Sequence, residues 1–167
     1  KTADMTFDTT TPKGYLDLPV NRKVFRTLSL INGTAYDLPG TNGSGFNSDL
    51  DRVEVEIFYP DGPKYWNGSN FSADASSFNV VSGTDTWSYS PPGLSAALTS
   101  GAYYVLKVRA VDRAANTQSG FTDIVSSRTF IVDKTPPTST IIRPIINGKY
   151  KPSGLTGVSA LNGSAAD

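Results

Sequence analysis

Four carboxylates fall within one short stretch of the chain, namely Asp49, Asp51, Glu54 and Glu56. Two facing carboxylates are what a glycosidase requires, one as general acid and the other as base or nucleophile. Glu54 and Glu56 alternate with apolar residues, so they are expected on the polar face of one strand, opposite the core. We interpret this cluster as a solvated strand face and not as a catalytic pair.

Other catalytic chemistry has little material in this sequence. The chain contains no histidine and no cysteine, which removes the commonest general base and both usual activated nucleophile pairs. Lys107 alternates onto a polar face, so it is not expected to be the buried lysine that amine chemistry needs. No glycine-rich phosphate-binding motif is present. The sequence therefore predicts that the chain is not an enzyme and needs no cofactor, with calcium as the one candidate ion.

The calcium hypothesis depends on three aspartates: Asp112 and Asp133 lie at expected strand ends, and Asp37 follows another turn. Hard oxygen ligands gathered near a linker between domains would stiffen a stalk. The alternative is that these residues cap turns, because Asp and Asn side chains accept hydrogen bonds from nearby backbone. No Asp-x-Asp-x-Asp run is present, so turn capping is the preferred interpretation.

A second candidate ligand site consists of aromatic residues in the long connection from Pro60 to Thr86, with Tyr65, Trp66 and Phe71 as its centre. Exposed aromatic rings can stack on sugar rings, and they also bind protein surfaces. The competing interpretation is that these rings fold inward and close the edge of the core. Possible partners are accordingly a glycan or a host surface protein.

Composition narrows the remaining classes. The 167 residues carry 15 basic and 15 acidic side chains, a net charge of zero, so no electrostatic footprint for nucleic acid is expected. The sequence has no stretch of about 18 apolar residues, so no membrane insertion is expected. The absence of an initiating methionine suggests a mature product or a fragment. Abundant Ser, Thr, Asn and Gly without cysteine favour an extracellular, cell-surface protein of bacterial type.

Alternating apolar residues and closely spaced turns predict an all-β protein. The run Asp51–Tyr59 places Val53, Val55 and Ile57 on one face, and Tyr104, Leu106 and Val108 alternate in the same way. At most one helical turn is expected in 73–77 and in 94–100. Strands separated by Gly, Pro and Asn turns favour an antiparallel β-sandwich. The predicted strands are Val24–Ile31, Asp51–Tyr59, Trp87–Ser90, Tyr103–Asp112 and Arg128–Asp133.

The two ends of the chain resemble each other, which indicates an internal repeat. Leu18-Pro19 followed by Asn32-Gly33-Thr34-Ala35 corresponds to Arg143-Pro144 followed by Asn162-Gly163-Ser164-Ala165. The lead-in before Pro12 resembles the one before Pro136, a period of 136 − 12 = 124 residues, and Asp37 aligns with Asp167 at 167 − 37 = 130. We therefore divide the chain into a preceding repeat or linker (1–10), a complete repeat (11–133), a Pro-rich linker (134–140) and the first strands of an incomplete repeat (141–167).

Several motifs resemble the bacterial immunoglobulin-like, cadherin-like tandem repeats of large surface proteins and adhesins. They are Tyr104-x-Leu-x-Val-x-Ala-x-Asp112, the turn that ends at Asn116, and the run Phe130 to Pro137. The resemblance implies an immunoglobulin-like Greek-key sandwich, with Ala115 where the family usually has Gly. Tyr104 is expected to form a tyrosine corner, Asp112 and Asn116 to cap a turn, and Pro136 and Pro137 to stiffen the linker.

These observations favour a structural, non-catalytic repeat of an extracellular stalk, adhesin or filament. Its expected partners are neighbouring immunoglobulin-like repeats or copies of itself, because an incomplete repeat leaves strand edges that invite exchange between copies. The alternative function is a carbohydrate-binding or host-protein-binding module that uses the aromatic connection 60–86.

Overall fold

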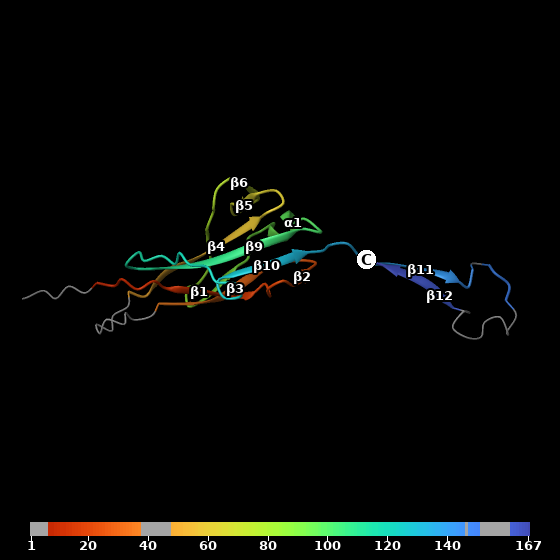
Figure 1. Cartoon of the computed structure of the whole chain (residues 1–167), viewed down its shortest axis with the longest axis horizontal. Coiled ribbons are helices and arrows are strands. Elements are labelled where there is room, and N and C mark those ends of the chain that lie inside the picture. Colours follow the sequence, from red (N-terminus) through yellow and green to blue (C-terminus); the bar gives the residue numbers. More distant parts are fainter. Residues whose placement is uncertain (1–6, 38–47, 146, 151–160) are drawn as a thin grey trace, which may run out of the picture. The chain divides into compact units, whose positions relative to one another are not determined.

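The computed structural model describes residues 7–37, 48–145, 147–150 and 161–167. Parts of the predicted lead-in and of the predicted second repeat therefore lie outside the described residues. Within them the chain is all-β, and its one helix is the single turn α1, Leu94–Ala97. The chain divides into two units, Lys1–Lys134 and Thr135–Asp167 (Figure 1).

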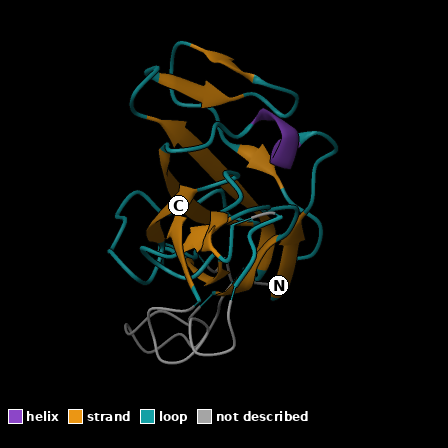
Figure 2. Ribbon diagram, turned by 90° about the vertical axis from the view of Figure 1, so that its right-hand side faces the viewer, coloured by secondary structure: helices purple, strands orange, loops and turns teal. Residues whose placement is uncertain are grey.

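The first unit consists of two facing sheets whose strands are mostly antiparallel (Figure 2). The smaller sheet has the order β1-β3-β8, with β1 at Lys13–Leu18, β3 at Ile31–Tyr36 and β8 at Thr86–Tyr89. The larger sheet has the order β2-β10-β9-β4-β5-β6, and β7 also pairs with β4. Its strands are β2 Val24–Phe25, β4 Leu50–Tyr59, β5 Lys64–Trp66, β6 Phe71–Ala73, β7 Asn79–Val80, β9 Tyr103–Asp112 and β10 Ser127–Val132.

The two ten-residue strands β4 and β9 form the centre of the larger sheet. They pair antiparallel from Leu50↔Asp112 to Phe58↔Val105, with one irregularity near the Leu50 end. Both sequences alternate, so one face of the pair carries Val53, Val55 and Val108, each with no exposed surface. This face packs on the inward residues of the smaller sheet and gives one hydrophobic core.

Two features of the first unit differ from the sequence-based expectation. The run Val24–Ile31 is not one strand, because only Val24 and Phe25 pair, in parallel, with Ile131 and Val132 of β10. The chain thus leaves the smaller sheet after β1 and joins the larger one at β2 before it returns as β3. The connection 60–86 holds three further short strands, β5, β6 and β7, which the sequence analysis did not predict.

The second unit is a two-stranded antiparallel sheet of β11, Thr138–Arg143, and β12, Asn162–Ala166. Strand β11 begins inside the predicted linker 134–140, so that linker is shorter than expected. Every described residue of both strands is exposed. The apolar residues Ile141 and Leu161 have 79 % and 70 % of their surface open to solvent.

Gly33 of β3 lies against the backbone of β1 on one side and against Trp87 of β8 on the other. A Cβ added to Gly33 would stand 1.9 Å from the Tyr15 carbonyl oxygen and 2.6 Å from a ring carbon of Trp87. A backbone oxygen and a buried indole cannot both move aside in a well-packed core. The close pairing of β1 with β3 therefore requires glycine here.

We expect Gly33→Ala to lower the free energy of unfolding by about 1–3 kcal/mol, because overpacking a core forces backbone shifts of that cost. Urea denaturation followed by tryptophan fluorescence measures the change. Gly120→Ala is the matched control, since a Cβ at Gly120 meets no atom within 4 Å. Equal stability of the two variants would contradict the close packing described above.

Candidate functional site

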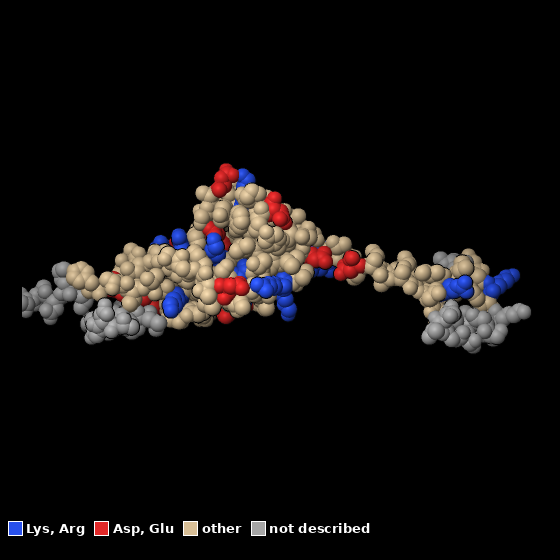
Figure 3. All heavy atoms as spheres, in the orientation of Figure 1, with Lys and Arg blue, Asp and Glu red and all other residues tan. Residues whose placement is uncertain are grey.

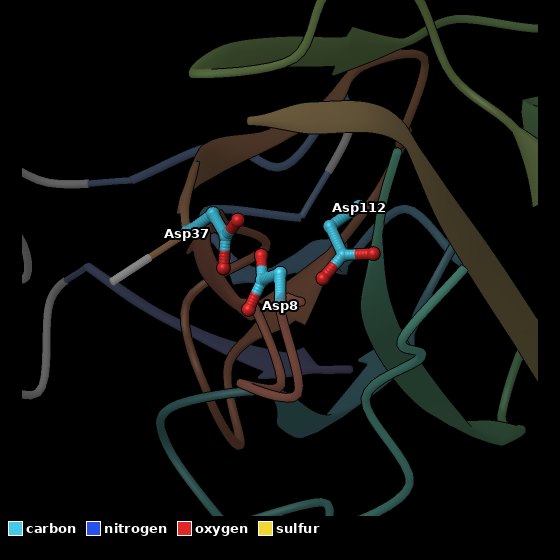
Figure 4. A group of neighbouring side chains, drawn as sticks. All are labelled: Asp8, Asp37 and Asp112. Atoms are coloured by element: carbon cyan, nitrogen blue, oxygen red, sulfur yellow. The ribbon is translucent and has the colours of Figure 1, made fainter. Parts of the chain in front are cut away.

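Three carboxylates converge at one end of the first unit. Asp8 precedes β1, Asp37 follows β3, and Asp112 ends β9; each offers an oxygen within 4.8 Å of the others (Figure 4). The sequence analysis named Asp37 and Asp112 but not Asp8, which it assigned to a preceding linker. The group is therefore a candidate cation site built from three separate segments of the chain.

Asp112 is held by the turn that follows β9. It is buried, its Oδ1 accepts the backbone N–H of Asn116 at 2.8 Å, and its Oδ2 accepts the Asn116 side-chain amide at 2.8 Å. The same amide donates to the carbonyl oxygen of Asp8 at 3.1 Å. Ala115 in this turn takes a left-handed φ of 69°, the conformation for which glycine is the usual residue. Asn116 thus ties the turn to the segment before β1.

Asp8 is fixed by hydrogen bonds from its own segment and from Ser48, which precedes β4. Its Oδ1 accepts from the hydroxyl and from the backbone N–H of Thr10, the latter at 2.9 Å. Its Oδ2 accepts the backbone N–H of Ser48 at 2.7 Å. These donors, Thr10 first, hold the pKa of Asp8 well below its usual range. Asp8 is therefore ionised at any physiological pH.

Asp37 is the member of the group whose pKa is raised. Burial raises the pKa of Asp37, and the negative charges of Asp8 and Asp112 raise it further, against a smaller opposing effect of the Ser48 backbone N–H. Like charges at this separation disfavour simultaneous ionisation. A bound cation would relieve the same repulsion.

The group has the chemistry of a hard-cation site. Calcium binds six to eight oxygens from carboxylates, carbonyls and water. Asp37 also borders a surface hollow whose lining includes Asp49, Asp85 and Arg113. The capping bonds of Asp8 and Asp112 orient their carboxylates, as bonds around metal ligands commonly do. Turn capping and ion binding therefore do not exclude each other in this arrangement.

Asp133, the third residue of the predicted calcium set, does not join this group. It follows β10, and its backbone N–H donates to the Phe25 carbonyl oxygen at 3.0 Å. The neighbouring Val132 donates its backbone N–H to Ala102, which immediately precedes β9, whereas Asp112 is the last residue of β9. The expectation that Asp133 shares a site with Asp37 and Asp112 is thus corrected, since about 30 Å of strand separates the two ends.

The aromatic candidates lie largely inside the protein. Trp66 has no exposed surface, and its indole N–H donates to the Tyr89 hydroxyl at 2.9 Å. Phe71 packs between Trp66 and Tyr104, with ring centroids 5.3 Å from each. Tyr65 is half-buried against Phe58. The indole face of Trp66 is therefore not available to stack on a sugar.

Glu54 and Glu56 of β4 are buried, which corrects the expectation that they lie on a solvated face. Glu54 has 6 % and Glu56 has 1 % of its surface exposed. The Arg109 Nε donates to Glu54 at 2.5 Å, and the Lys107 Nζ donates to Glu56 at 3.0 Å. Burial raises the pKa of Glu54, but hydrogen bonds from Arg52 and Arg109 outweigh it and keep the pKa below its usual value.

Aromatic rings cover these charges. The Arg109 guanidinium lies 3.8 Å from the centroid of the Phe78 ring, and the Lys107 ammonium lies 5.3 Å from that of Phe121. Phe78 and Phe121 stack on each other at 6.0 Å. Cation–π contacts of this kind stabilise partly desolvated cations. On this face the two carboxylates are buried, the side chains of Lys107 and Arg109 stay 34 % and 31 % exposed, and each carboxylate is paired with a basic side chain and not with the other carboxylate.

The remaining predicted structural residues take simple positions. Tyr104 is fully buried, and its hydroxyl accepts the backbone N–H of Thr99 at 2.8 Å. Pro136 and Pro137 are exposed and lie between β10 and β11. Basic and acidic side chains are interspersed on the face shown in Figure 3, without a field of one sign.

Comparisons with family models, with curated proteins and with solved structures give no match to this chain. Within the described residues, no helix has the length and apolar character needed to span a membrane. The candidate functions below therefore depend on the residues themselves.

We expect Asp37→Asn to unfold at a higher temperature than the unchanged chain at pH 7 without divalent ions. Because the pKa of Asp37 is raised in the folded chain, the Asp37 carboxyl of the unfolded chain loses its proton at a lower pH. The free energy of unfolding therefore falls as pH rises from the ordinary pKa to the raised pKa. The difference between variant and unchanged chain should be small below pH 3.8, the ordinary pKa, and should grow as pH rises. Thermal melts from pH 3 to pH 8 measure it.

The same pair of proteins tests for calcium at pH 7. A cation held by the group binds only the native state, so millimolar calcium should raise the melting midpoint of the unchanged chain and leave Asp37→Asn unmoved. Asp133→Asn, at the opposite end, is the matched control and should keep the full response. Identical midpoints of the unchanged chain in calcium and in EDTA would remove the cation site.

Proposed function

We propose that this chain is a structural, non-catalytic, immunoglobulin-like repeat of a bacterial extracellular stalk, adhesin or filament. The observation that carries the proposal is the path of the chain through its first unit. Asp8 contacts the turn after Asp112, whereas Lys134 follows a strand that ends beside Ala102. The chain thus enters at one end of β9 and leaves at the other (Figure 1).

A path of this kind suits a unit that transmits tension. Strand β2 is the second strand of the unit in chain order, and β10 is its last. The two strands are parallel neighbours in the larger sheet. Tension on the ends of the chain pulls them in opposite directions along their length, so their hydrogen bonds are loaded together. These bonds join Arg22 to Thr129 at 2.5 Å, Ile131 to Lys23 at 3.0 Å and Asp133 to Phe25 at 3.0 Å.

The catalytic and ligand-binding alternatives have less support. The chain has no histidine or cysteine, and the buried Glu54 and Glu56 are bound by cations. A binding module based on the aromatic connection would need exposed rings, but Trp66 is wholly buried. A stalk repeat needs neither a nucleophile nor a ligand.

We also infer that the first unit has an immunoglobulin-like fold. Two facing sheets, a buried tyrosine on the penultimate strand with its hydroxyl on backbone, and a first strand that divides between the sheets are consistent with it. The resemblance in sequence of the turn at Asn116 and of the run after Phe130 supports the same family.

Asp133→Pro should lower the force at which the first unit unfolds when the chain is pulled by its two ends. The substitution removes the N–H that donates to the Phe25 carbonyl oxygen, one bond of the loaded ladder. Single-molecule force spectroscopy measures the effect.

Val55→Ala is the control for stability alone, because Val55 lies in the core of β4 and outside the ladder. It should lower the free energy of unfolding by about 1–3 kcal/mol yet change the force less than Asp133→Pro does. An unchanged force for Asp133→Pro would contradict the proposal that the β2–β10 pair resists the applied tension.

The extracellular part of the proposal is tested in the source organism. Antibodies raised against the chain should label intact cells before any permeabilisation. Labelling that requires permeabilised cells would remove the surface location, whatever the mechanical result.

A further inference from the structure

The hairpin β11–β12 has the same internal geometry as the pair β1–β3. Leu16 lies opposite Gly33 in the first pair, and Ile141 lies opposite Gly163 in the second. Each register is interrupted after that position, between Leu16 and Leu18 and between Ile141 and Arg143. The first strands are related by 141 − 16 = 125 residues and the second strands by 163 − 33 = 130.

The two glycines also share a contact. A Cβ at Gly163 would stand 2.3 Å from the Thr140 carbonyl oxygen, and a Cβ at Gly33 would stand 1.9 Å from that of Tyr15. Tyr15 and Thr140 are equivalent by the same offset of 125 residues. Both hairpins thus need glycine at one position for one reason.

The two hairpins differ in how much of their apolar face is buried by other strands. Leu16 and Ile31 are 2 % and 0 % exposed in the first unit. Their equivalents Ile141 and Leu161 are 79 % and 70 % exposed. Apolar residues at inward positions of a strand pair are stable in water only when a further layer covers them. The second hairpin therefore presents a face made for burial.

The first unit supplies a template for that cover. Strand β8 pairs with the free edge of β3, Gly33 opposite Trp87, and the Trp87 ring lies over Gly33. The second layer comes from β4 and β9, whose Val108 lies close to Gly14. A hairpin of this geometry is therefore covered by two elements. One is a strand with an inward aromatic residue, and the other is a sheet of alternating β-branched residues.

We propose that the face of β11–β12 formed by Ile141, Leu161 and Gly163 is a docking site for one kind of occupant. The occupant is a polypeptide segment with the strand pattern of residues 50–132 of this chain and no opening hairpin of its own. Its β8-like strand pairs along the free edge of β12 with an aromatic ring over Gly163, and its β4–β9-like sheet covers Ile141 and Leu161. This inference extends the proposed repeat function, since it specifies what one repeat unit requires from its partner.

Exchange of hairpins between copies of this chain is a weaker solution. A copy that accepted β11–β12 would have to release its own β1–β3, so one apolar hairpin face would stay exposed for each that was buried. The fit is also poorer, because Ser139 takes the position of Gly14. A Cβ at Gly14 would stand 3.1 Å from Val108. The favoured partner therefore lacks its own hairpin and has room opposite Ser139.

The test extends the full chain after Asp167 with a second copy of its own residues 38–134, the segment that follows Asp37 in the first unit. Hydrogen–deuterium exchange is read on peptides that cover Thr138–Ile145 and Leu161–Asp167, which occur once in the extended chain. We expect backbone amides of both peptides to exchange at least tenfold more slowly in the extended chain than in the original one.

Substitutions at neighbouring positions make this test specific. Ile141→Asp should restore fast exchange, because Ile141 is equivalent to the buried Leu16. Ile142→Asp is the matched control and should keep the protection, because Ile142 is equivalent to Asp17, which is exposed. Ser139→Gly is tested in parallel, so that crowding against the second copy of Val108 cannot imitate a failure of the proposal.

Equally fast exchange in the original and extended chains, with and without Ser139→Gly, would overturn the docking site. Protection that survives Ile141→Asp would also overturn it, since the apolar face would then not be the contact. The force and surface-labelling experiments above report on the first unit and on location. Their failure would refute the proposed function and leave the result for the hairpin unchanged.

Discussion

The antiparallel pairing of β4 with β9 is the constraint on which the rest of the structure depends. Eight residue pairs join the two strands, and the alternation of both sequences sends every second side chain to the same face. One face is wholly apolar and receives the smaller sheet. The other carries Glu54 and Glu56 opposite Arg109 and Lys107, so each acid lies directly across from a base.

That second face explains how a chain of modest apolar content buries both sides of its central strands. Buried charges are costly unless they are paired and hydrogen-bonded, and the cross-strand register provides the pairing. Phe78 and Phe121 then cover part of the two basic side chains, which stay about one third exposed. The connection 60–86 thus supplies Trp66 to the core and Phe78 to the ion-pair face.

The sequence predicted the elements with strict alternation and failed where alternation is short or ambiguous. The predicted span of β9 agrees with the structure residue for residue, and that of β4 to within one residue. The two-residue strands β2 and β7 have too few side chains to show a period, so only the tertiary pairing reveals them. Burial of Glu54 was missed because a polar face reads as solvated unless its covering segment is known.

The candidate site shows the same limit. The pattern places Asp112 at a strand end and Asp37 after a turn, but which of these positions meet in space depends on topology. Asp133 was chosen and Asp8 overlooked, although the offset of 125 residues that relates β1 to β11 also relates Asp8 to Asp133. The repeat signal was therefore present in the sequence, and only the three-dimensional partner of each aspartate was not.

The substitution of Ser139 for Gly14 has a consequence for biosynthesis. Two hairpins of equal register on one chain would compete for the same sheet during synthesis, and competition of this kind favours misassembly between neighbouring repeats. The first hairpin is made earlier and fits against Val108, whereas a side chain at the Gly14 position would crowd it. A hydroxymethyl group at this position would therefore weaken closure of the first sheet on the second hairpin and favour its closure on the first.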